Sequence, residues 1–439
     1  MSDQMSTRLA NRILLGLVVG AAAGGLTLAV GGIYPDLLDA ARRFSTLVLD
    51  PLGQVFLRLL FFVVIPLVFA SLASGIAQLE RLSELGPLAG RTFLLFFINM
   101  SIAVALGLVM MNVLEPGSAM DPEAQARLTE EYGGAARQHI ERRAAQPAVT
   151  PMTIVEMFMP RNLFGAFVGN SRDALGDVLP LILFAILVGA AATRLAREPR
   201  DRFRSSLATI TDLMTSIVHF ALSIAPYAVP AMIYSVVVKI GWDIVVALGV
   251  FVAGCIFVML LHLFGTMSLW VKMLAGRGPL EFWKQMRPVL VTAFSTSSSA
   301  ATLPTALAVA RRDIGVRPPV AGFVLPLGAT MNMAGTALYE GCVVLFVAQV
   351  FGIDLSFVQQ MTLLLLAVLS AVAVAAIPGG SLPLIAGLLA SFGIPPEGIG
   401  IILGVDRLLD MTRTMVNVSS DVVTAAVVDR HTKLEETPA

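Results

Sequence analysis

Long runs without a charged residue constrain this chain more than any other feature. A helix needs about 20 apolar residues to cross the hydrocarbon core of a bilayer. Nine stretches of the 439-residue sequence contain no Asp, Glu, Lys or Arg, and a tenth apolar segment, 398–429, carries isolated charges. The nine are 13–35, 59–79, 92–114, 178–193, 213–238, 244–271, 288–310, 318–339 and 355–396. The sequence therefore predicts an all-α integral membrane protein that crosses the bilayer several times.

Composition excludes several other classes of protein. Charged residues make up 14% of the chain, against about 25% in soluble domains. Lys+Arg and Asp+Glu balance at 30 each, so no net charge attracts nucleic acid. Both cysteines, Cys255 and Cys342, lie in apolar runs, which excludes a disulfide framework and a cysteine-bound metal cluster. An ordinary soluble enzyme, a disordered chain and a nucleic-acid-binding protein are excluded, and no cofactor is expected.

Two stretches do not fit simple spanning helices. Stretch 288–310 has the polar run Ser295-Thr-Ser-Ser-Ser-Ala-Ala-Thr-Leu-Pro304 at its centre, and its apolar flanks are each too short to cross a bilayer. Stretch 355–396 is broken by Pro378-Gly379-Gly380-Ser381. Irregular backbone at membrane depth is tolerated only where it is buried in protein or lines a water-filled cavity. We predict a re-entrant helical hairpin at 288–310, and at 355–396 either a second hairpin or two full spans.

The basic residues indicate the orientation of the chain, because Lys and Arg are denser in cytoplasmic loops. Three basic loops and both ends of the chain fall on one side if 288–310 returns to the side from which it enters. Both termini are then cytoplasmic, and the expected location is the plasma membrane, the inner membrane of a bacterium. The second half becomes an inverted repeat of hairpin and polar helix, a common plan of secondary transporters. The residues concerned are Arg8, Arg12, Arg194, Arg197, Arg200, Arg202, Arg204, Lys272, Arg277, Lys284, Arg287, Arg311, Arg312, Arg317, Arg430 and Lys433.

The last helix carries the strongest functional signal. At 3.6 residues per turn, five polar residues of this helix share a stripe about 80° wide; they are Asp406, Asp410, Arg413, Asn417 and Asp421. Facing lipid, the four charges would cost on the order of 10 kcal/mol, so they must face protein or water. An internal ion-pair network is the structural alternative. The excess of acids over the one base in the stripe favours a site that binds a cation.

Segment 326–340 provides a second signal. Asn332, Gly335 and Thr336 lie close together, which favours local unwinding and frees backbone carbonyls. Such carbonyls, with Asn and Asp oxygens, suit a hard cation such as sodium. A helix-packing patch of small residues is the alternative. Glu340 is an isolated carboxyl that could pair with a base or carry a proton, because burial favours its neutral form.

The remaining motifs give weak evidence for a binding site or argue against other functions. The Ser-rich tip of 288–310 offers hydroxyls and backbone N–H groups that suit a carboxylate, although such runs are common in loops. The sequence contains no Walker loop and no nucleophile–base pair, so neither ATP-driven transport nor enzymatic activity is indicated.

Three motifs in this order resemble the glutamate/aspartate transporter family, the dicarboxylate/amino acid:cation symporters. The similarity runs from about residue 10 to residue 430. It is most specific in Ser297-Ser-Ser-Ala-Ala-Thr-Leu-Pro304, Asn332-Met-Ala-Gly-Thr336 and Asp410-Met-Thr-Arg-Thr-Met-Val-Asn417.

The resemblance implies eight transmembrane helices plus two re-entrant hairpins, a homotrimer and an elevator movement. Residues 1–83 and 151–239 would form a scaffold of helices one, two, four and five, with an extracytoplasmic loop at 115–150. Helix three, at 84–114, and residues 240–430 would form the mobile transport domain, in which the second hairpin is the gate. Residues 431–439 would be a cytoplasmic tail.

The family also implies a role for individual residues. Arg413 matches the position that binds the substrate's side-chain carboxylate, and Asp410 the position that takes its α-amino group. The other matched substrate positions are Asn417, Thr336, Thr414, Ser298, Ser299 and, in the gate, Ile377, Gly379, Gly380 and Ser381. The matched sodium positions are Asp421, Asn417, Asn332 and Gly328 in one site and Thr330 in another. Glu340 matches a position associated with proton coupling.

One motif departs from the family. The signature is Asn-Met-Asp-Gly-Thr, and Ala334 stands in place of its Asp. That Asp serves a deeper sodium site whose partners on the third helix align with Phe96, Asn99 and Met100. An aromatic ring and a thioether are poor sodium ligands, so we expect this site to be absent or altered.

We therefore expect a secondary active symporter for a small acidic amino acid, aspartate or glutamate, with sodium or protons as coupling ions. A C4-dicarboxylate or neutral amino-acid carrier is the first alternative. An anion channel lined by Arg413 is the alternative from another class.

Overall fold

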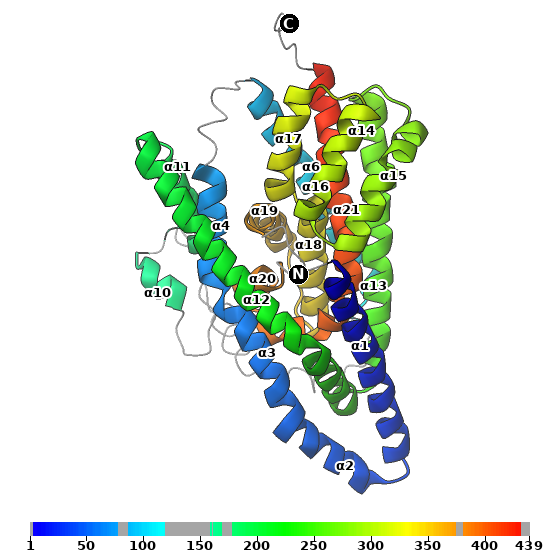
Figure 1. Ribbon diagram of the computed structural model, residues 1–439. Coiled ribbons are helices and arrows are strands. Elements are labelled where there is room, and N and C mark those ends of the chain that lie inside the picture. Colours follow the sequence, from blue (N-terminus) through cyan, green and yellow to red (C-terminus); the bar gives the residue numbers. More distant parts are fainter. Residues whose placement is uncertain are drawn as a thin grey trace, which may run out of the picture.

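The computed structural model describes residues 3–77, 87–118, 159, 161–168, 178–374 and 381–431. All regular structure in these ranges is helical, which confirms the predicted all-α class (Figure 1). Most of the loop predicted at 115–150 and nearly all of the predicted tail at 431–439 lie outside the described residues.

One group of helices packs around α12 (Arg197–Ile240), which contacts α1, α3 and α4. α12 runs obliquely across one side of the molecule in Figure 1. α4 also packs against α11, and the short α10 lies beside α11. The other members are α1 (Asp3–Gly31), α2 (Pro35–Phe44), a π-helical turn η1 (Ser45–Leu49), α3 (Asp50–Phe62), α4 (Val64–Ala77), α10 (Leu163–Val168) and α11 (Val178–Ala192).

The contact between α1 and α12 depends on glycines. Gly16, Gly20 and Gly24 repeat every fourth residue of α1 and face α12. A Cβ at Gly20 would come within 2.6 Å of the Pro230 carbonyl oxygen. Small residues at this spacing allow helix backbones to approach closely, as is common between membrane helices.

A second group of helices surrounds α21 (Ile399–His431), the last helix in the element order. α21 packs against α6, α13, α14, α15, α16, α17 and α18. α18 is nearly as central, since each of its residues except Gln349 is buried. The helices are α6 (Pro87–Leu114), α13 (Asp243–Leu261), a π-helical turn η2 (His262–Thr266), α14 (Met267–Met273), α15 (Pro279–Thr296), α16 (Ser299–Arg312), α17 (Pro318–Met331), α18 (Ala334–Val350), α19 (Phe357–Ala373), α20 (Leu382–Ser391) and the 3-10 turn η3 (Pro396–Gly398).

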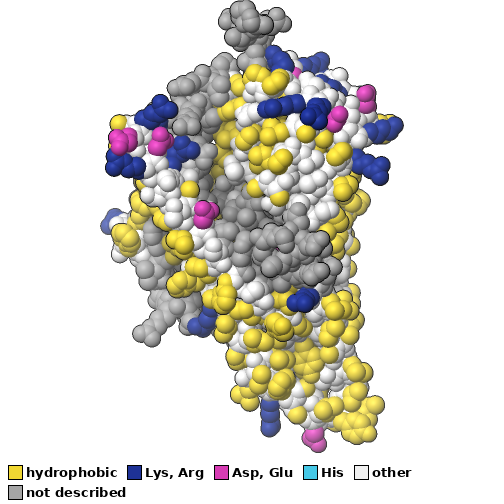
Figure 2. All heavy atoms as spheres, in the orientation of Figure 1, with side chains coloured by type: hydrophobic (Ala, Val, Ile, Leu, Met, Phe, Trp, Pro, Cys, Tyr) yellow, Lys and Arg dark blue, Asp and Glu magenta, His cyan; other side chains and the backbone are white. Residues whose placement is uncertain are grey.

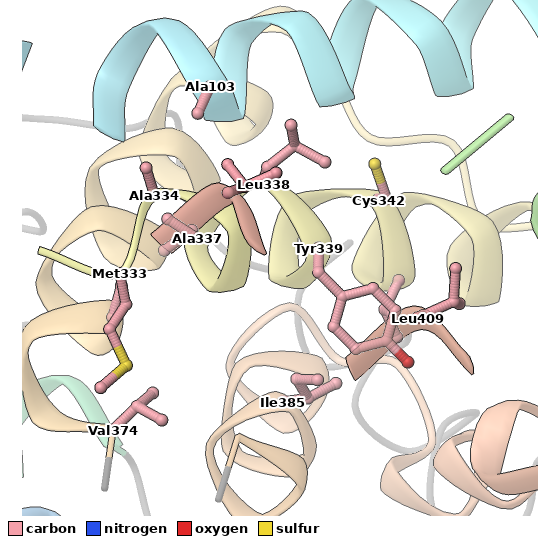
Figure 3. Close-up of a cluster of buried hydrophobic side chains, with 14 of the residues drawn as sticks. Ala103, Met333, Ala334, Ala337, Leu338, Tyr339, Cys342, Val374, Ile385 and Leu409 are labelled. Carbon is pink, nitrogen blue, oxygen red and sulfur yellow. The ribbon is translucent and has the colours of Figure 1, made fainter. Parts of the chain in front are cut away.

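The core of this second group lies where α18 meets α6, α20 and α21. Figure 3 shows Ala334, Leu338 and Cys342 on the side of α18 toward α6, and Tyr339 on the side toward α20 and α21. These side chains are all fully buried. The buried apolar side chains of α18 thus pack toward both α6 and the α20–α21 side.

The chain reverses between two helices within the stretch 288–310, as predicted, but the tip is shorter than expected; the re-entrant course of this hairpin in the membrane stays a prediction. α15 and α16 pack against each other, and the chain reverses at Ser297 and Ser298. Ser297 is left-handed, with φ 50°, and the Ser298 hydroxyl accepts a hydrogen bond from the Ala301 N–H at the start of α16. Helix α16 runs through Pro304, so that residue lies inside the returning arm rather than at the tip. α19 and α20 are the described parts of the second predicted hairpin; Ile377, Gly379 and Gly380 lie outside the described residues.

The surface suits a membrane protein. On the face shown in Figure 2, charged side chains gather toward one end, near α11–α12 and α14–α17. Large apolar side chains are exposed elsewhere, for example Leu26 at 67%, Phe62 at 78% and Tyr227 at 70%. Apolar surface on this scale is not typical of soluble monomers.

In the described ranges, four helical segments are long and apolar enough to cross a membrane: Leu88–Leu114, Ser223–Ile240, Asp243–Met273 and Pro318–Val350. The apolar part of α1, Leu15–Gly31, is shorter, and α21 carries the charged stripe. The count of eight therefore stays a prediction.

Candidate functional site

The charged stripe of α21 is buried, as the sequence predicts. Asp410 and Arg413 are each 3% exposed, Asn417 4%, and Asp421 2%; Asp406 is also buried. α21 can hold these groups because it is covered by the α15–α16 hairpin and by α17 and α18. Buried charges need partners of opposite charge or hydrogen bonds, and the structure provides both.

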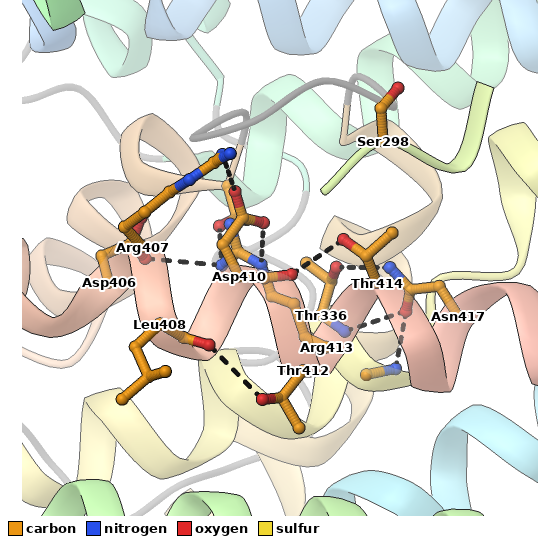
Figure 4. Close-up of polar contacts among 12 residues, drawn as sticks. Ser298, Thr336, Asp406, Arg407, Leu408, Asp410, Thr412, Arg413, Thr414 and Asn417 are labelled. Carbon is orange, nitrogen blue, oxygen red and sulfur yellow. Dashed lines mark hydrogen bonds and ion pairs between the residues drawn. The ribbon is translucent and has the colours of Figure 1, made fainter. Parts of the chain in front are cut away.

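Arg413 is the centre of the ion-pair network in Figure 4. Its Nε and Nη2 both lie 2.8 Å from Asp410 Oδ1, and its Nη1 is 3.6 Å from Asp406 Oδ1. Nη1 also donates to Ser381 Oγ at 2.6 Å, at the start of α20. The guanidinium lies 5.0 Å from the centre of the Tyr339 ring, within cation–π range. Arg413 thus joins three elements, α18, α20 and α21, at one point.

A second arginine contacts the same carboxylate. Arg407 Nη1 lies 3.6 Å from Asp410 Oδ2, the oxygen that Arg413 leaves open. Helical spacing places Arg407 about 100° from Asp406, off the stripe, where the sequence predicts that it snorkels or forms a local pair. The pair is with Asp410 itself, and the network therefore holds two bases rather than one.

The interrupted helix α17–α18 meets α21 at Asn417. Helix α17 ends at Met331 and α18 begins at Ala334, which confirms the unwinding predicted at this segment. The N–H groups of Gly335 and Thr336, in the first turn of α18, donate to Asn417 Oδ1 at 2.7 and 3.2 Å. In return, Asn417 Nδ2 donates to Thr336 Oγ1 at 3.1 Å. Asn417 therefore replaces the intrahelical bonds that the start of α18 lacks.

Gly335 is required by this contact. A Cβ there would overlap the Arg413 carbonyl oxygen and would lie 2.9 Å from both the Arg413 Cα and the Val416 Cβ. The backbones of α18 and α21 meet at this point because no side chain separates them.

A polar cluster surrounds Asp421 one turn further along α21. Asn332 Nδ2 donates to Asp421 Oδ1 and to Ser420 Oγ, both at 2.8 Å. Asn99 of α6 donates to the same Ser420 hydroxyl. A Cβ at Gly328 would overlap the Asp421 carboxylate, so the α17 backbone lies directly against that group.

Two amide oxygens in this cluster, Asn332 Oδ1 and Asn99 Oδ1, are buried without a hydrogen-bond partner among the described residues. Buried acceptors are normally satisfied, and an oxygen set of this kind fits a sodium ion or a water molecule.

The position of the missing signature Asp is apolar. Ala334 is fully buried, and Phe96 and Met100 of α6 are 1% and 2% exposed. Asn99 is the one polar residue among the three aligned positions of α6, and its amide hydrogen bonds to Ser420.

The remaining predicted residues differ in their surroundings. Ser299 is buried and Ser298 half-buried at the hairpin tip, and in Figure 4 Ser298 lies apart from the ion-pair network, with no contact drawn to it. The Thr414 hydroxyl donates to the Asp410 carbonyl of its own helix. Thr330 is exposed, and its hydroxyl donates to the Leu327 carbonyl. Both threonine hydroxyls are therefore engaged within their own helices.

Glu340 lies one turn beyond Thr336 on α18 and is fully buried. Neither carboxyl oxygen has a hydrogen bond among the described residues. Ser370 of α19 is the polar side chain beside it, and Arg413 is the nearby base. A buried carboxylate of this kind is costly when ionised unless a base or hydrogen bonds compensate it.

The structure also brings in residues that the sequence did not single out. Ser420 and Tyr339 join the network from neutral positions, and their types carry no distinctive signal. Because Arg407 lies off the polar stripe, the stripe alone did not predict its contact with Asp410. A spacing of three residues on a helix does permit an ion pair, however.

Comparison with known proteins supplies the family. Residues 9–431 match the model of the sodium:dicarboxylate symporter family. The chain is 32% identical to a proton/sodium-glutamate symport protein of Bacillus subtilis, over 96% of this chain and 92% of the relative. It is 28% identical to a proton/glutamate-aspartate symporter of Escherichia coli, over 96% and 92% of the two chains. It is also 28% identical to a C4-dicarboxylate transport protein of Deinococcus radiodurans, over 95% and 88%.

Proposed function

The chain belongs to the sodium:dicarboxylate symporter family, and on that premise we propose that it carries aspartate or glutamate across the plasma membrane together with sodium, protons or both. The family is one of transporters, so the protein is not an enzyme. It is a multi-pass membrane protein whose substrates lie among the acidic amino acids and dicarboxylates named for its relatives.

The observation that carries the proposal is the buried pair of Arg413 and Asp410. The Arg413 fork suits a carboxylate, and Asp410 suits an ammonium group. In the structure each of the two residues compensates the charge of the other, with two contacts of 2.8 Å between them. A zwitterionic acid offers both charges and can replace both partners at once. A neutral amino acid lacks the second carboxylate for Arg413, which argues against that alternative.

The second hairpin contacts the substrate pocket, which supports its proposed role as a gate. The neutral hydroxyl of Ser381, at the start of α20, accepts a hydrogen bond from Arg413 Nη1 at 2.6 Å. Substrate that binds the same guanidinium must displace this hydroxyl or be enclosed beside it. Movement of the second hairpin at Ser381 would then expose or cover the site, which favours a carrier over a permanently open anion channel.

Sodium coupling rests on the cluster of Asp421, Asn417, Asn332 and Gly328. One carboxylate with several amide and carbonyl oxygens suits a monovalent hard cation. Because Asn417 also orders the start of α18 beside Arg413, an ion in this cluster and a substrate one turn away stabilise the same arrangement. Each should strengthen the binding of the other by the same factor.

The deep sodium site is proposed to be lost. Its place is lined by Ala334, Phe96 and Met100, all buried and without oxygen in their side chains. A dehydrated cation there would lack both charge and coordination. We expect fewer coupled sodium ions than in relatives that keep the Asp, with a proton on Glu340 supplying driving force. A reversal potential measured under sodium and pH gradients counts both ions.

The architecture proposed for the family also fits the packing. The helices around α12 and those around α21 form two groups, which meet where α1 and α12 touch α21 and where α4 touches α19. The first is the proposed scaffold of a homotrimer, and the second is the proposed transport domain that moves as an elevator, with α15–α16 and α19–α20 as re-entrant hairpins and both termini cytoplasmic.

Titration of the purified protein with a panel of acids tests the proposal. Aspartate, glutamate, succinate and alanine are compared by thermal shift with sodium and with potassium. The proposal expects aspartate or glutamate to stabilise the protein, and more so in sodium. Stabilisation by alanine alone would overturn it.

A further inference from the structure

Asp410 is held between two arginines, one on each carboxylate oxygen. Arg413 contacts Oδ1 with two nitrogens at 2.8 Å, and Arg407 contacts Oδ2 with Nη1 at 3.6 Å. Figure 4 shows Arg407 reaching over Asp410 from the preceding turn of α21. Oδ2 is therefore the side of Asp410 on which a substrate ammonium can compete with Arg407.

The Arg407 contact is loose for a buried arginine. Its side chain is 10% exposed, 3.6 Å exceeds hydrogen-bond length, and its Nε has no hydrogen-bond partner among the described residues. Arg317 provides a contrast at the far end of α21. Its Nε lies 2.8 Å from Asp429 Oδ1, and its Nη2 donates to the Asp429 carbonyl at 2.5 Å. The Arg317–Asp429 pair is thus closely bonded, and the Arg407–Asp410 pair is not.

We propose that Arg407 is a specificity-determining residue that competes with the substrate's amino group for Asp410. The inference rests on the proposed function, because it concerns the same pocket. An acidic amino acid must displace Arg407 from Oδ2, and its ammonium then lies beside a like charge. A dicarboxylate without an amino group leaves the Arg407–Asp410 pair intact and Asp410 compensated.

The consequence is weak discrimination between the two substrate classes. Without Arg407, a dicarboxylate that occupied Arg413 would strand Asp410 as an uncompensated buried carboxylate, which is strongly unfavourable. With Arg407, that penalty is removed for the dicarboxylate and a repulsion is added for the amino acid. Both effects act in the same direction on the ratio of the two affinities.

Aspartate and succinate are the matched probes, since they share four carbons and two carboxylates and differ by the amino group alone. Their Kd values are measured by calorimetric titration at saturating sodium for the native protein and for Arg407→Met, which keeps an unbranched side chain and removes the charge. The ratio of succinate Kd to aspartate Kd should rise about tenfold or more in the variant. Arg407→Lys, which keeps the charge, should stay near the native ratio.

Two controls isolate the contact. Arg430→Met makes the same change on the same helix, where the Arg430 side chain donates to the Leu274 carbonyl, and should leave the ratio unaltered. In an Asp410→Asn background, Arg407→Met should no longer shift the ratio. If Arg407→Met does not fold, Arg407→Gln provides the same comparison.

The outcomes are distinguishable. A ratio within about twofold of native in the neutral variant, or native protein that binds aspartate with no detectable succinate binding, would overturn the role of Arg407 and leave the proposed function standing. Native protein that binds neither acidic amino acid would overturn the proposed function itself.

Discussion

Replacement of Arg413 by Ala is the sharpest perturbation of the pocket. It removes two contacts of 2.8 Å to Asp410, the contact to Ser381 and the 3.6 Å pair with Asp406. It also removes the partner of the substrate carboxylate, and truncating one partner of a buried charge pair costs about 2–5 kcal/mol of binding free energy. Since 1.4 kcal/mol is about tenfold in affinity, acidic substrates should bind on the order of 10²–10³-fold more weakly.

The remaining carboxylates keep a partial counterion in Arg407, so the variant should fold. Its Kd for aspartate and glutamate is measured by titration, and its monodispersity by size-exclusion chromatography. Arg413→Lys keeps the charge without the planar fork and should lose less. A folded Arg413→Ala protein that binds aspartate within about threefold of native would refute the assignment of the pocket, because the missing guanidinium could not then have held a carboxylate.

Three further perturbations test neighbouring parts of the site. Asp421→Asn keeps an oxygen for Asn332 but removes the charge. The increase in substrate affinity caused by sodium, measured by titration at low and high sodium, should therefore fall about tenfold. An unchanged increase would contradict the ion site. Gly335→Ala places a Cβ against the α21 backbone and should abolish aspartate binding and lower Tm, whereas Gly249→Ala of α13, which has open space, should do neither. Glu340→Gln should remove the response of uptake to a pH gradient, and native protein that already ignores the gradient would exclude a proton role.

Much of the fold could be predicted because apolar run length is a direct physical requirement of the bilayer. The same logic placed the charges of α21 inside, since lipid exposure of Asp410 and Arg413 is prohibitive. The break before Ala334 was also predictable, because Asn332 and Gly335 weaken a helix. These features depend on local composition and on one strong environmental constraint.

The pairing within the site could not be predicted in the same way. Helical spacing places Arg407 outside the polar stripe, yet its side chain is long enough to reach Asp410 from there. The contact of Asn99 with Ser420 joins residues 321 positions apart, and no local pattern encodes it. The exact reversal of the first hairpin depended on which serine adopted the left-handed conformation, and the run of serines offered several equivalent choices.

Accumulation of aspartate against its own gradient tests the central claim most directly. Purified protein is reconstituted into liposomes with equal aspartate on both sides, and an inward sodium gradient is imposed, with and without an inward proton gradient. A coupled symporter must concentrate aspartate or glutamate inside, and the effect must vanish when the sodium and proton gradients are removed. If neither acid accumulates under any of these gradients, while flux down its own gradient persists, the protein is a passive pathway and the account of coupled transport is wrong.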